Sequence, residues 1–236
     1  MIETTIFQSS LLNKIENLAH GYSSRQHGDM QKMELRSAFA NTLGLDGRTL
    51  IKPQQVHGNA IALVSRIGND AIVKGVDGLV SQSRSLSIIS ADCIPMLAVD
   101  PKTRVLGAAH AGWQGTIDGI ATNLITKMLE HGAVREEIRI AIGPRIGLSC
   151  YDVPFERAEL FRKKYGARDI VKKLGDTWHI DIGKANVRAL RLAGIPKHNI
   201  DVLPVCTSCN IDTLFSFRKD SQESYGEMVG IIGWRN

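Results

Sequence analysis

The chain has 236 residues, of which 43% are apolar and 22% charged, the proportions of an ordinary globular protein that can bury a core without disulfides. Its net charge of +5 and pI near 9.1 suggest nucleic-acid binding. However, the basic residues are scattered among acidic ones, and the longest basic cluster, 162–164, is short. Because no basic stripe is present, we expect no nucleic-acid partner, and a small anion such as phosphate explains the excess equally well.

The sequence also argues against secretion and membrane insertion. The N-terminus has no basic segment followed by an apolar run, and no stretch approaches the roughly 18 apolar residues of a membrane span. Four unevenly spaced cysteines do not form a secreted disulfide framework. We therefore expect a cytoplasmic protein with free thiols, at least one of which is a ligand or nucleophile. No repeat or linker divides the chain, which predicts a single domain over residues 1–236.

Apolar patterning predicts the elements in chain order. A polar loop at 21–28 precedes a helical pattern from Met33 to Leu43 that stops at Gly44. The clearest amphipathic helix runs over 117–129, with Gly132 placed to end it. Further helical patterns cover 155–164 and 183–192. Strands are predicted at 60–64, after the turn at 75–78, and at 86–90, 94–99, 105–109, 138–142, 202–205 and 228–232.

These predicted strands outnumber the helices and do not alternate regularly with them. This order favours an α+β fold with large mixed or antiparallel sheets over a doubly wound Rossmann fold. Neither a Gly-x-Gly-x-x-Gly motif after a strand nor a P-loop is present.

Three potential metal ligands, His57, Cys93 and His110, lie at predicted strand ends or turns among small residues. Two imidazoles and one thiolate suit zinc, and three protein ligands leave a fourth position open, as in catalytic sites. A structural interpretation stays open from spacing alone. Cysteine is among the most buried residue types, a histidine can be satisfied by a hydrogen bond, and the three do not form a compact motif.

The blocks around these residues resemble a known family. Residues 55–58 (Gln-Val-His-Gly), 91–95 (Ala-Asp-Cys-Ile-Pro) and 110–116 (His-Ala-Gly-Trp-Gln-Gly-Thr) are similar to signature blocks of the YfiH-like family. This family is also called the laccase-domain or polyphenol-oxidase-like family, and it includes the peptidoglycan editing factor. Further similar blocks lie at 22–25, 142–144, 150–153, 206–209 and 215–218. The resemblance therefore extends from about residue 20 to the end.

The resemblance implies a fold, a metal and an activity. The fold would be a four-layer α/β/β/α sandwich with mixed sheets, related to cysteine hydrolases. His57, Cys93 and His110 would be zinc ligands. The implied activity is purine nucleoside phosphorolysis, on adenosine, guanosine, inosine and methylthioadenosine, together with adenosine deamination. Copper-dependent phenol oxidation is an older label of the family.

Two positions depart from the family pattern. Members of the family commonly carry arginine after the Gly-Trp of the third block, where this chain has Gln114. If that arginine contacts phosphate, the departure affects phosphate affinity or specificity. The early loop commonly reads Arg-x-Gly-Gly, whereas here His27 precedes Gly28. His27 either adds an imidazole facing the ligand or fills a position in the loop, and we favour the second.

Deamination requires an acid that delivers a proton to the leaving ammonia. Zinc deaminases of nucleobases use a glutamate in a His-x-Glu signature, which is absent near His57 and His110. Asp92 and Asp77 are the candidate substitutes. Either could instead hold a ligand histidine or cap a turn.

Phosphorolysis requires groups that bind phosphate. Arg25, Arg145 and Arg218 lie in the family-like blocks, and arginine suits bidentate phosphate contacts. Gln55 is a further candidate for substrate binding. A helix that starts near Gln114 would also present free N–H groups close to His110.

The Cys206-x-x-Cys209 pair can be a redox motif or half of a zinc site. No second such pair and no thioredoxin-like βαβ unit is present, so we interpret it as structural or as a wall of the pocket.

Three other classes compete with a zinc nucleoside enzyme. A thiol hydrolase would use Cys93 as nucleophile and His57 or His110 as base, which suits an editing role on peptidoglycan precursors. A copper phenol oxidase is disfavoured by seven histidines without a His-x-His pair. A non-enzymatic module would not require three convergent ligands. The sequence leaves the oligomeric state open.

Overall fold

The computed structural model describes residues 5–64, 72–166, 169–221 and 223–235. The helices are α1 (Met33–Thr42), α2 (Trp113–Asp118), α3 (Ile120–Glu130), α4 (Phe155–Tyr165) and α5 (Ile182–Leu192). The first strands are β1 (Leu18–Tyr22), β2 (Lys52–Pro53), β3 (Ile61–Leu63), β4 (Ile72–Val73), β5 (Gly78–Ser81), β6 (Leu86–Ser90) and β7 (Ile94–Asp100). The later strands are β8 (Val105–Ala111), β9 (Arg139–Ile142), β10 (Asp152–Val153), β11 (Val171–Leu174), β12 (Thr177–Ile180), β13 (Ile200–Val202) and β14 (Met228–Trp234).

A mixed six-stranded sheet, in the order β13-β9-β7-β8-β5-β3, forms the centre of the fold. Its outer pairs, β13 with β9 and β3 with β5, are parallel, and the other pairs are antiparallel. Alternate residues along β7 enter different cores. Met96 and Ala98 pack under the helices, whereas Leu97 and Val99 face the second sheet. Successive side chains of a strand point to opposite faces of the sheet, and each face of β7 is covered by another layer, so the strand is buried on both faces.

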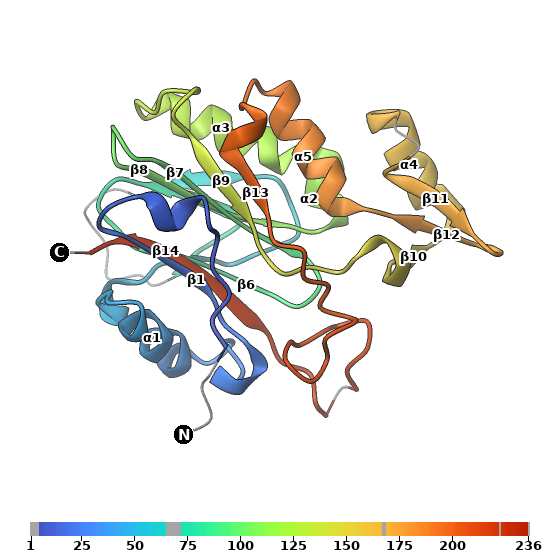
Figure 1. The fold of residues 1–236 in the computed structure, drawn as a ribbon, viewed down its shortest axis with the longest axis horizontal. Helices are drawn as coiled ribbons and strands as arrows, with labels where there is room; N and C mark the ends of the chain where they lie inside the picture. The colour runs from blue at the N-terminus through green and yellow to red at the C-terminus, as the bar shows by residue number, and fades with distance from the viewer. Residues whose placement is uncertain (1–4, 65–71, 167–168, 222, 236) are drawn as a thin grey trace.

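Helices α2, α3 and α5 cover one face of the six-stranded sheet (Figure 1). The apolar stripe of α3, including Leu124, Ile125 and Met128, is fully buried there. The other face packs against an antiparallel sheet, β1-β14-β6, through a second core. Helix α1 covers the outer face of that smaller sheet, where Phe39 is buried with Val229 and Ile231. The expected four-layer α/β/β/α sandwich is therefore confirmed.

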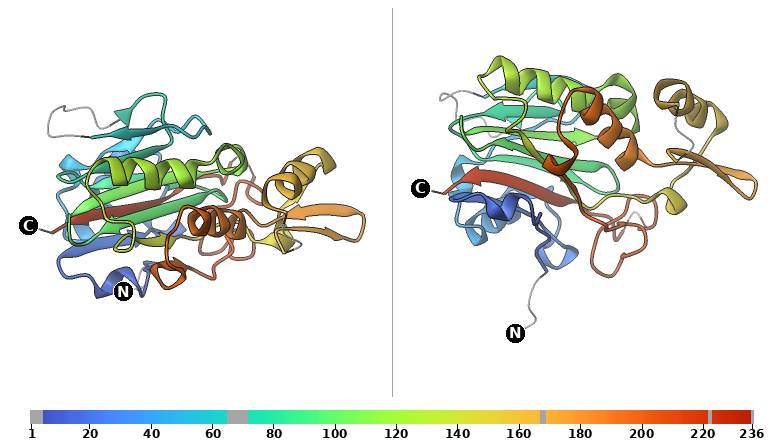
Figure 2. Two further views of the ribbon diagram at one scale, coloured as in Figure 1. Left: turned by 90° about the horizontal axis from the view of Figure 1, so that it is seen from above. Right: turned by 45° about the horizontal axis from the view of Figure 1, so that its top comes forward.

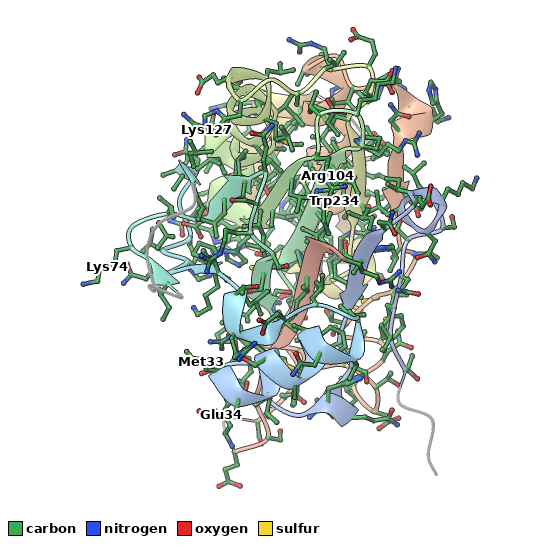
Figure 3. All side chains as sticks on the ribbon, turned by 90° about the vertical axis from the view of Figure 1, so that its left-hand side faces the viewer. Met33, Glu34, Lys74, Arg104, Lys127 and Trp234 are labelled. Carbon is green, nitrogen blue, oxygen red and sulfur yellow. The ribbon has the colours of Figure 1, made fainter. Side chains whose placement is uncertain are left out.

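The two sheets are joined at one end by the turn between β7 and β8. The indole nitrogen of Trp234, at the end of β14, donates a hydrogen bond of 3.0 Å to the main-chain oxygen of Arg104. The Arg104 guanidinium lies 4.2 Å from the centre of the Trp234 ring, and Figure 3 shows the two side chains together. The opposite ends of the same strands meet at the candidate site.

A small antiparallel sheet, β10-β12-β11, lies with α4 at one end of the molecule, beyond α5 (Figures 1 and 2). Phe161 and Tyr165 of α4 anchor it in the same core as α3 and α5. This unit forms one wall of the candidate site.

Three differences from the sequence prediction have physical causes. The helix predicted over 117–129 is interrupted by Gly119, whose φ of 90° ends α2 and begins α3. The strand predicted at 202–205 is wrong beyond Val202, where β13 ends. A short strand expected at Ile51, leading into Pro53, corresponds to β2. Strands β1, β4, β10, β11 and β12 were not predicted, because most are short or form a largely exposed hairpin without strong alternation. In the described ranges, no helix is long and apolar enough to cross a membrane.

Candidate metal centre and active site

The segment that contains Cys93 carries the chain from one sheet to the other. β6 ends at Ser90 in the smaller sheet, and β7 begins at Ile94 in the larger one. Between them, Asp92 has a φ of 80°, in the left-handed region that aspartate tolerates better than most residues. This tight crossing places Cys93 at the end of the layer between the sheets, beside the end of β8, which carries His110.

Asp77 organises the loop that carries His57. Its carboxylate is fully buried and accepts hydrogen bonds from the backbone N–H groups of Val56 (3.1 Å), His57 (2.9 Å) and Gly58 (2.8 Å). These bonds hold His57 in an unusual backbone conformation with a φ of 61°. Burial raises the pKa of Asp77, but its hydrogen bonds, above all the one from His110, hold the pKa below its ordinary value. The carboxylate is therefore ionised.

The same carboxylate orients His110, which is almost fully buried near the end of β8. Nδ1 of His110 lies 3.0 Å from the Asp77 carboxylate. Because an ionised carboxylate only accepts, Nδ1 carries the hydrogen and Nε2 is left for another partner. A carboxylate that fixes the tautomer of a histidine in this way is the usual support of a metal-binding imidazole.

The three predicted ligands converge. The ligand atoms of His57, Cys93 and His110 all lie within 4.8 Å of one another. The two imidazole rings have centroids 4.9 Å apart and an interplanar angle of 86°. In a tetrahedral zinc site, Zn–S of about 2.3 Å and Zn–N of about 2.0 Å place ligand atoms roughly 3.5 Å apart. The donor set and its spacing therefore fit a zinc ion after small side-chain rotations.

Gly112 makes room for this cluster. A β-carbon at this position would lie 3.1 Å from Sγ of Cys93, 3.3 Å from Cδ2 of His57 and 3.9 Å from Cε1 of His110. The first two distances are tighter than ordinary van der Waals contact. Glycine thus allows all three side chains to approach one point.

The electrostatics of the cluster favour a thiolate. Burial raises the pKa of Cys93, but the charge and hydrogen bonds of His110 and His57 outweigh it and lower the pKa to about 7. Burial lowers the pKa of His110, and the Cys93 thiolate and Asp77 outweigh that effect and raise it to about 10. A thiolate is the form of cysteine that binds metals and attacks electrophiles.

A cavity of about 500 Å³ adjoins the cluster, and all three ligand residues line it. Four aromatic side chains form much of its wall: Trp113, Tyr151, Phe217 and Tyr225. Phe217 and Tyr225 contact each other edge to face, with ring centroids 5.7 Å apart. Such a surface suits a flat, partly apolar ligand.

Gln55 and Asp92 line this cavity but are largely engaged with the protein. The Gln55 amide donates 2.8 Å to the oxygen of Ile89 and accepts 3.0 Å from its N–H, which fixes the loop before His57 against the end of β6. Asp92 accepts hydrogen bonds from the Thr207 hydroxyl and, at 2.7 Å, from the N–H of Arg218. Burial outweighs these bonds and raises the pKa of Asp92. Both residues hold neighbouring loops in place.

Of the three predicted arginines, only Arg218 lines the cavity. Its guanidinium pairs with the Asp152 carboxylate at 2.5 Å and lies 5.3 Å from the centre of the Tyr151 ring.

The other two arginines are engaged outside the cavity. Arg25 pairs with Asp220 at 2.5 Å and stacks on Phe215. Arg145 donates 2.9 Å to the main-chain oxygen of Leu203. Neither is among the residues that line the cavity.

The two positions that depart from the family pattern also lie outside the cavity lining. Nδ1 of His27 is 3.1 Å from the N–H of Ser24, and its ring contacts Phe39 edge to face. This packing fits the interpretation of His27 as a loop residue. Gln114 follows Trp113, the first residue of α2, a helix of six residues.

Sequence reasoning missed two charged residues of the cavity. Arg157 of α4 lies with its guanidinium 4.1 Å from the centre of the Trp113 ring. Within the described ranges, no carboxylate pairs with it, in contrast to Arg218. Glu227 precedes β14 and accepts a hydrogen bond of 3.3 Å from the Tyr225 hydroxyl. Burial raises its pKa. No local sequence motif identifies either residue as part of a site. The fold brings both to the cavity, Arg157 from α4 and Glu227 from the segment before β14.

Comparison with known proteins places this chain in one family. A profile of the family described as multi-copper polyphenol oxidoreductase laccase matches residues 17–235. The crystal structure of YlmD from Geobacillus stearothermophilus superposes with a TM-score of 0.83 at 30% identity, covering 94% of this chain and 93% of that one. The chain therefore belongs to this laccase-like family, as the sequence blocks predicted.

Curated relatives carry names of nucleoside enzymes. Adenosine deaminase RL5, from an unknown prokaryotic organism, is 31% identical over 214 residues, which cover 86% of this chain and 82% of that protein. Human purine nucleoside phosphorylase LACC1 is 32% identical over 219 residues, which cover 89% of this chain and 49% of that protein. This chain thus spans about half the length of the human relative.

Proposed function

We propose that this chain is a zinc-dependent purine nucleoside enzyme that catalyses phosphorolysis of adenosine, guanosine, inosine and methylthioadenosine, and deamination of adenosine. The observation that carries the proposal is the convergence of His57, Cys93 and His110 on one wall of an aromatic cavity of about 500 Å³. The names of the relatives support the substrate class. A nucleoside and phosphate are then the partners, and the cytoplasm is the proposed location.

His57, Cys93 and His110 would hold the zinc ion, whose Lewis acidity would act at this wall of the cavity. Asp77 keeps both histidines in place through the His57 N–H and His110 Nδ1. Two nitrogens and one sulfur match zinc better than a multi-copper centre, which needs many more histidines than the two that meet here.

The aromatic residues that line the cavity, Trp113, Tyr151, Phe217 and Tyr225, would hold the purine base. For deamination, Glu227 is the first candidate acid, because it lines the cavity and burial raises the pKa of its carboxyl group, which favours the protonated form. Asp92 is the other candidate, with a raised pKa of its own but with both oxygens engaged.

For phosphorolysis, Arg157 and Arg218 would bind the attacking phosphate and screen its charge as the glycosidic bond breaks. Arg157 takes this role more readily, because Arg218 already pairs with Asp152. Arg157 would also supply the cation that Gln114 does not provide.

One observation favours a second candidate. Cys93, with a pKa of about 7, lies beside His110, which in turn is oriented by Asp77. This is the order of nucleophile, base and orienting carboxylate in thiol hydrolases. A Cys93-dependent hydrolase, for example one that edits peptidoglycan precursors, would use the same residues without metal.

One experiment separates the two candidates. The purified chain and Cys93→Ala are analysed for zinc, and each is incubated with adenosine with and without phosphate while adenine and inosine are measured. The nucleoside enzyme is supported if the parent holds about one zinc at this centre, the variant loses it, and only the parent forms adenine or inosine. Absent metal, rapid alkylation of Cys93 and unchanged adenosine would overturn it in favour of the hydrolase.

A further inference from the structure

A second group of potential metal ligands lies outside the candidate active site. Cys150 ends a 3-10 turn, Leu148–Cys150, and Cys206 and Cys209 belong to the loop that follows β13. The three sulfurs lie within 4.8 Å of one another, and those of Cys150 and Cys209 are 3.3 Å apart. All are free thiols. None of them lines the 500 Å³ cavity.

The spacing of these sulfurs suits a metal ion. With Zn–S of about 2.3 Å, tetrahedral geometry places two thiolate sulfurs roughly 3.8 Å apart. The Cys150–Cys209 separation of 3.3 Å is somewhat shorter than this value, and all three sulfurs lie within 4.8 Å of one another, so small side-chain rotations suffice. Cys206 and Cys209 are also separated by two residues, the span by which a single loop supplies two ligands in structural zinc sites.

A backbone donor and a buried cation lie close to Cys206. The N–H of Gly147 donates a hydrogen bond of 3.1 Å to Sγ of Cys206. Arg145 pairs with Cys206 as an isolated parallel bridge, and its Nε is buried without a hydrogen-bond partner in the described part of the chain. A buried cation is stabilised by a negative neighbour, and three thiolates around a divalent ion carry a net negative charge.

We propose that Cys150, Cys206 and Cys209 form a second metal site, which binds a thiolate-seeking ion, Zn²⁺, through their three sulfurs. Thiolates select zinc among the abundant divalent ions. Because Cys209 is exposed, solvent reaches the site and completes the coordination. In the described ranges, no fourth histidine, cysteine or carboxylate joins the group.

The position of this site gives the ion a structural role beside the cavity. Cys150 is followed by Tyr151, an aromatic wall residue. Between the other two cysteines, the Thr207 hydroxyl donates to Asp92, the neighbour of Cys93. An ion held by the three sulfurs would tie these two walls of the cavity together without touching its ligand.

The test counts zinc per chain in four forms of the full-length protein, purified with a reductant and a small excess of zinc: the parent, Cys209→Ser, Cys93→Ala and the double variant. Cys209 is exposed, so its replacement is expected to leave the fold intact, which circular dichroism checks. We expect each single variant to lose one zinc and a different one, and the double variant to lose both. Cys93→Ala serves as the matched control, because it removes a thiol from the other cluster.

Alkylation of the thiols gives a second readout that does not depend on activity or on the proposed function. Cys150 and Cys206 are expected to be protected in the parent and to react after chelation, with unchanged protection in Cys93→Ala. Equal zinc content in the parent and Cys209→Ser would overturn the proposal. So would a disulfide between Cys150 and Cys209, identified by peptide mass mapping of protein purified without the reductant. A parent protein that turns over adenosine but holds zinc only at His57, Cys93 and His110 would overturn this site while leaving the nucleoside enzyme intact.

Discussion

The Asp77 carboxylate accepts a hydrogen bond from the N–H of His57 and lies 3.0 Å from Nδ1 of His110. One buried side chain thus fixes two predicted metal ligands that are far apart in the sequence. Loss of this carboxylate would therefore act on the proposed zinc site through both histidines.

We predict that Asp77→Asn lowers zinc affinity at the first centre about 10- to 100-fold, because the amide can donate to Nδ1 and favour the wrong tautomer. Competition with a chromophoric chelator measures the affinity. Asp46→Asn, at an exposed 3-10 turn, is the control and should match the parent. Equal affinity in Asp77→Asn would show that Asp77 does not orient the ligands.

Gly112→Ala is expected to weaken zinc binding by about tenfold or more, because its β-carbon would lie 3.1 Å from Sγ of Cys93. Gly58→Ala is a matched control on the neighbouring loop, where the nearest atom would be an ordinary 3.5 Å away. The same titration compares both with the parent. Similar losses in both variants would point to a general disturbance rather than to crowding of Cys93.

Arg157→Gln should raise the KM for phosphate about 10- to 100-fold in nucleoside phosphorolysis, since a charge-assisted hydrogen bond contributes about 1.5–3 kcal/mol. Arg162→Gln, on the same helix but paired with Glu159 at the surface, should behave as the parent. Initial rates at varied phosphate give the KM. A drop in kcat with unchanged phosphate KM would assign Arg157 to the base rather than to phosphate.

Glu227→Gln should lower adenosine deamination about 10²- to 10⁴-fold, as expected for loss of a general acid. Burial raises the pKa of Glu227, and the protonated form is the active one. Deamination by the parent should therefore fall as pH rises through that raised pKa, and the variant should lack this decline. An unchanged pH profile in the variant would remove Glu227 from the mechanism and leave Asp92 as the acid.

His20 makes folding stability depend on pH. Burial, assisted by Arg235 and opposed by Asp201, lowers its pKa to about 4, and Nε2 accepts a 2.9 Å hydrogen bond from the N–H of Ser9. The unfolded chain binds the proton from about pH 6.5, so the folded state loses roughly 3 kcal/mol between pH 6.5 and 4.

Denaturant titrations across this pH range test the prediction. His20→Gln keeps an acceptor for Ser9 and should remove most of this dependence, whereas His198→Gln, at an exposed position, should not. A parallel decline in the parent and in His20→Gln would refute the assignment to His20.

The sequence by itself predicted the family and the four-layer fold, which are confirmed, and it singled out the three residues that converge at the cavity, because local blocks around strand ends carry the family resemblance. The period of two in β7 and the apolar stripe of α3 also follow from local composition. The extent of the domain and the roles of the predicted site residues stay predictions.

Only the tertiary structure decided what surrounds those ligands. It assigned Asp77 to the two histidines, brought Arg157 and Glu227 into the cavity, and turned Arg25 and Arg145 to partners elsewhere. It also joined Cys150 to the Cys206–Cys209 loop. Such contacts join residues far apart in the chain, and they depend on how layers stack and where strands end, which no local pattern encodes.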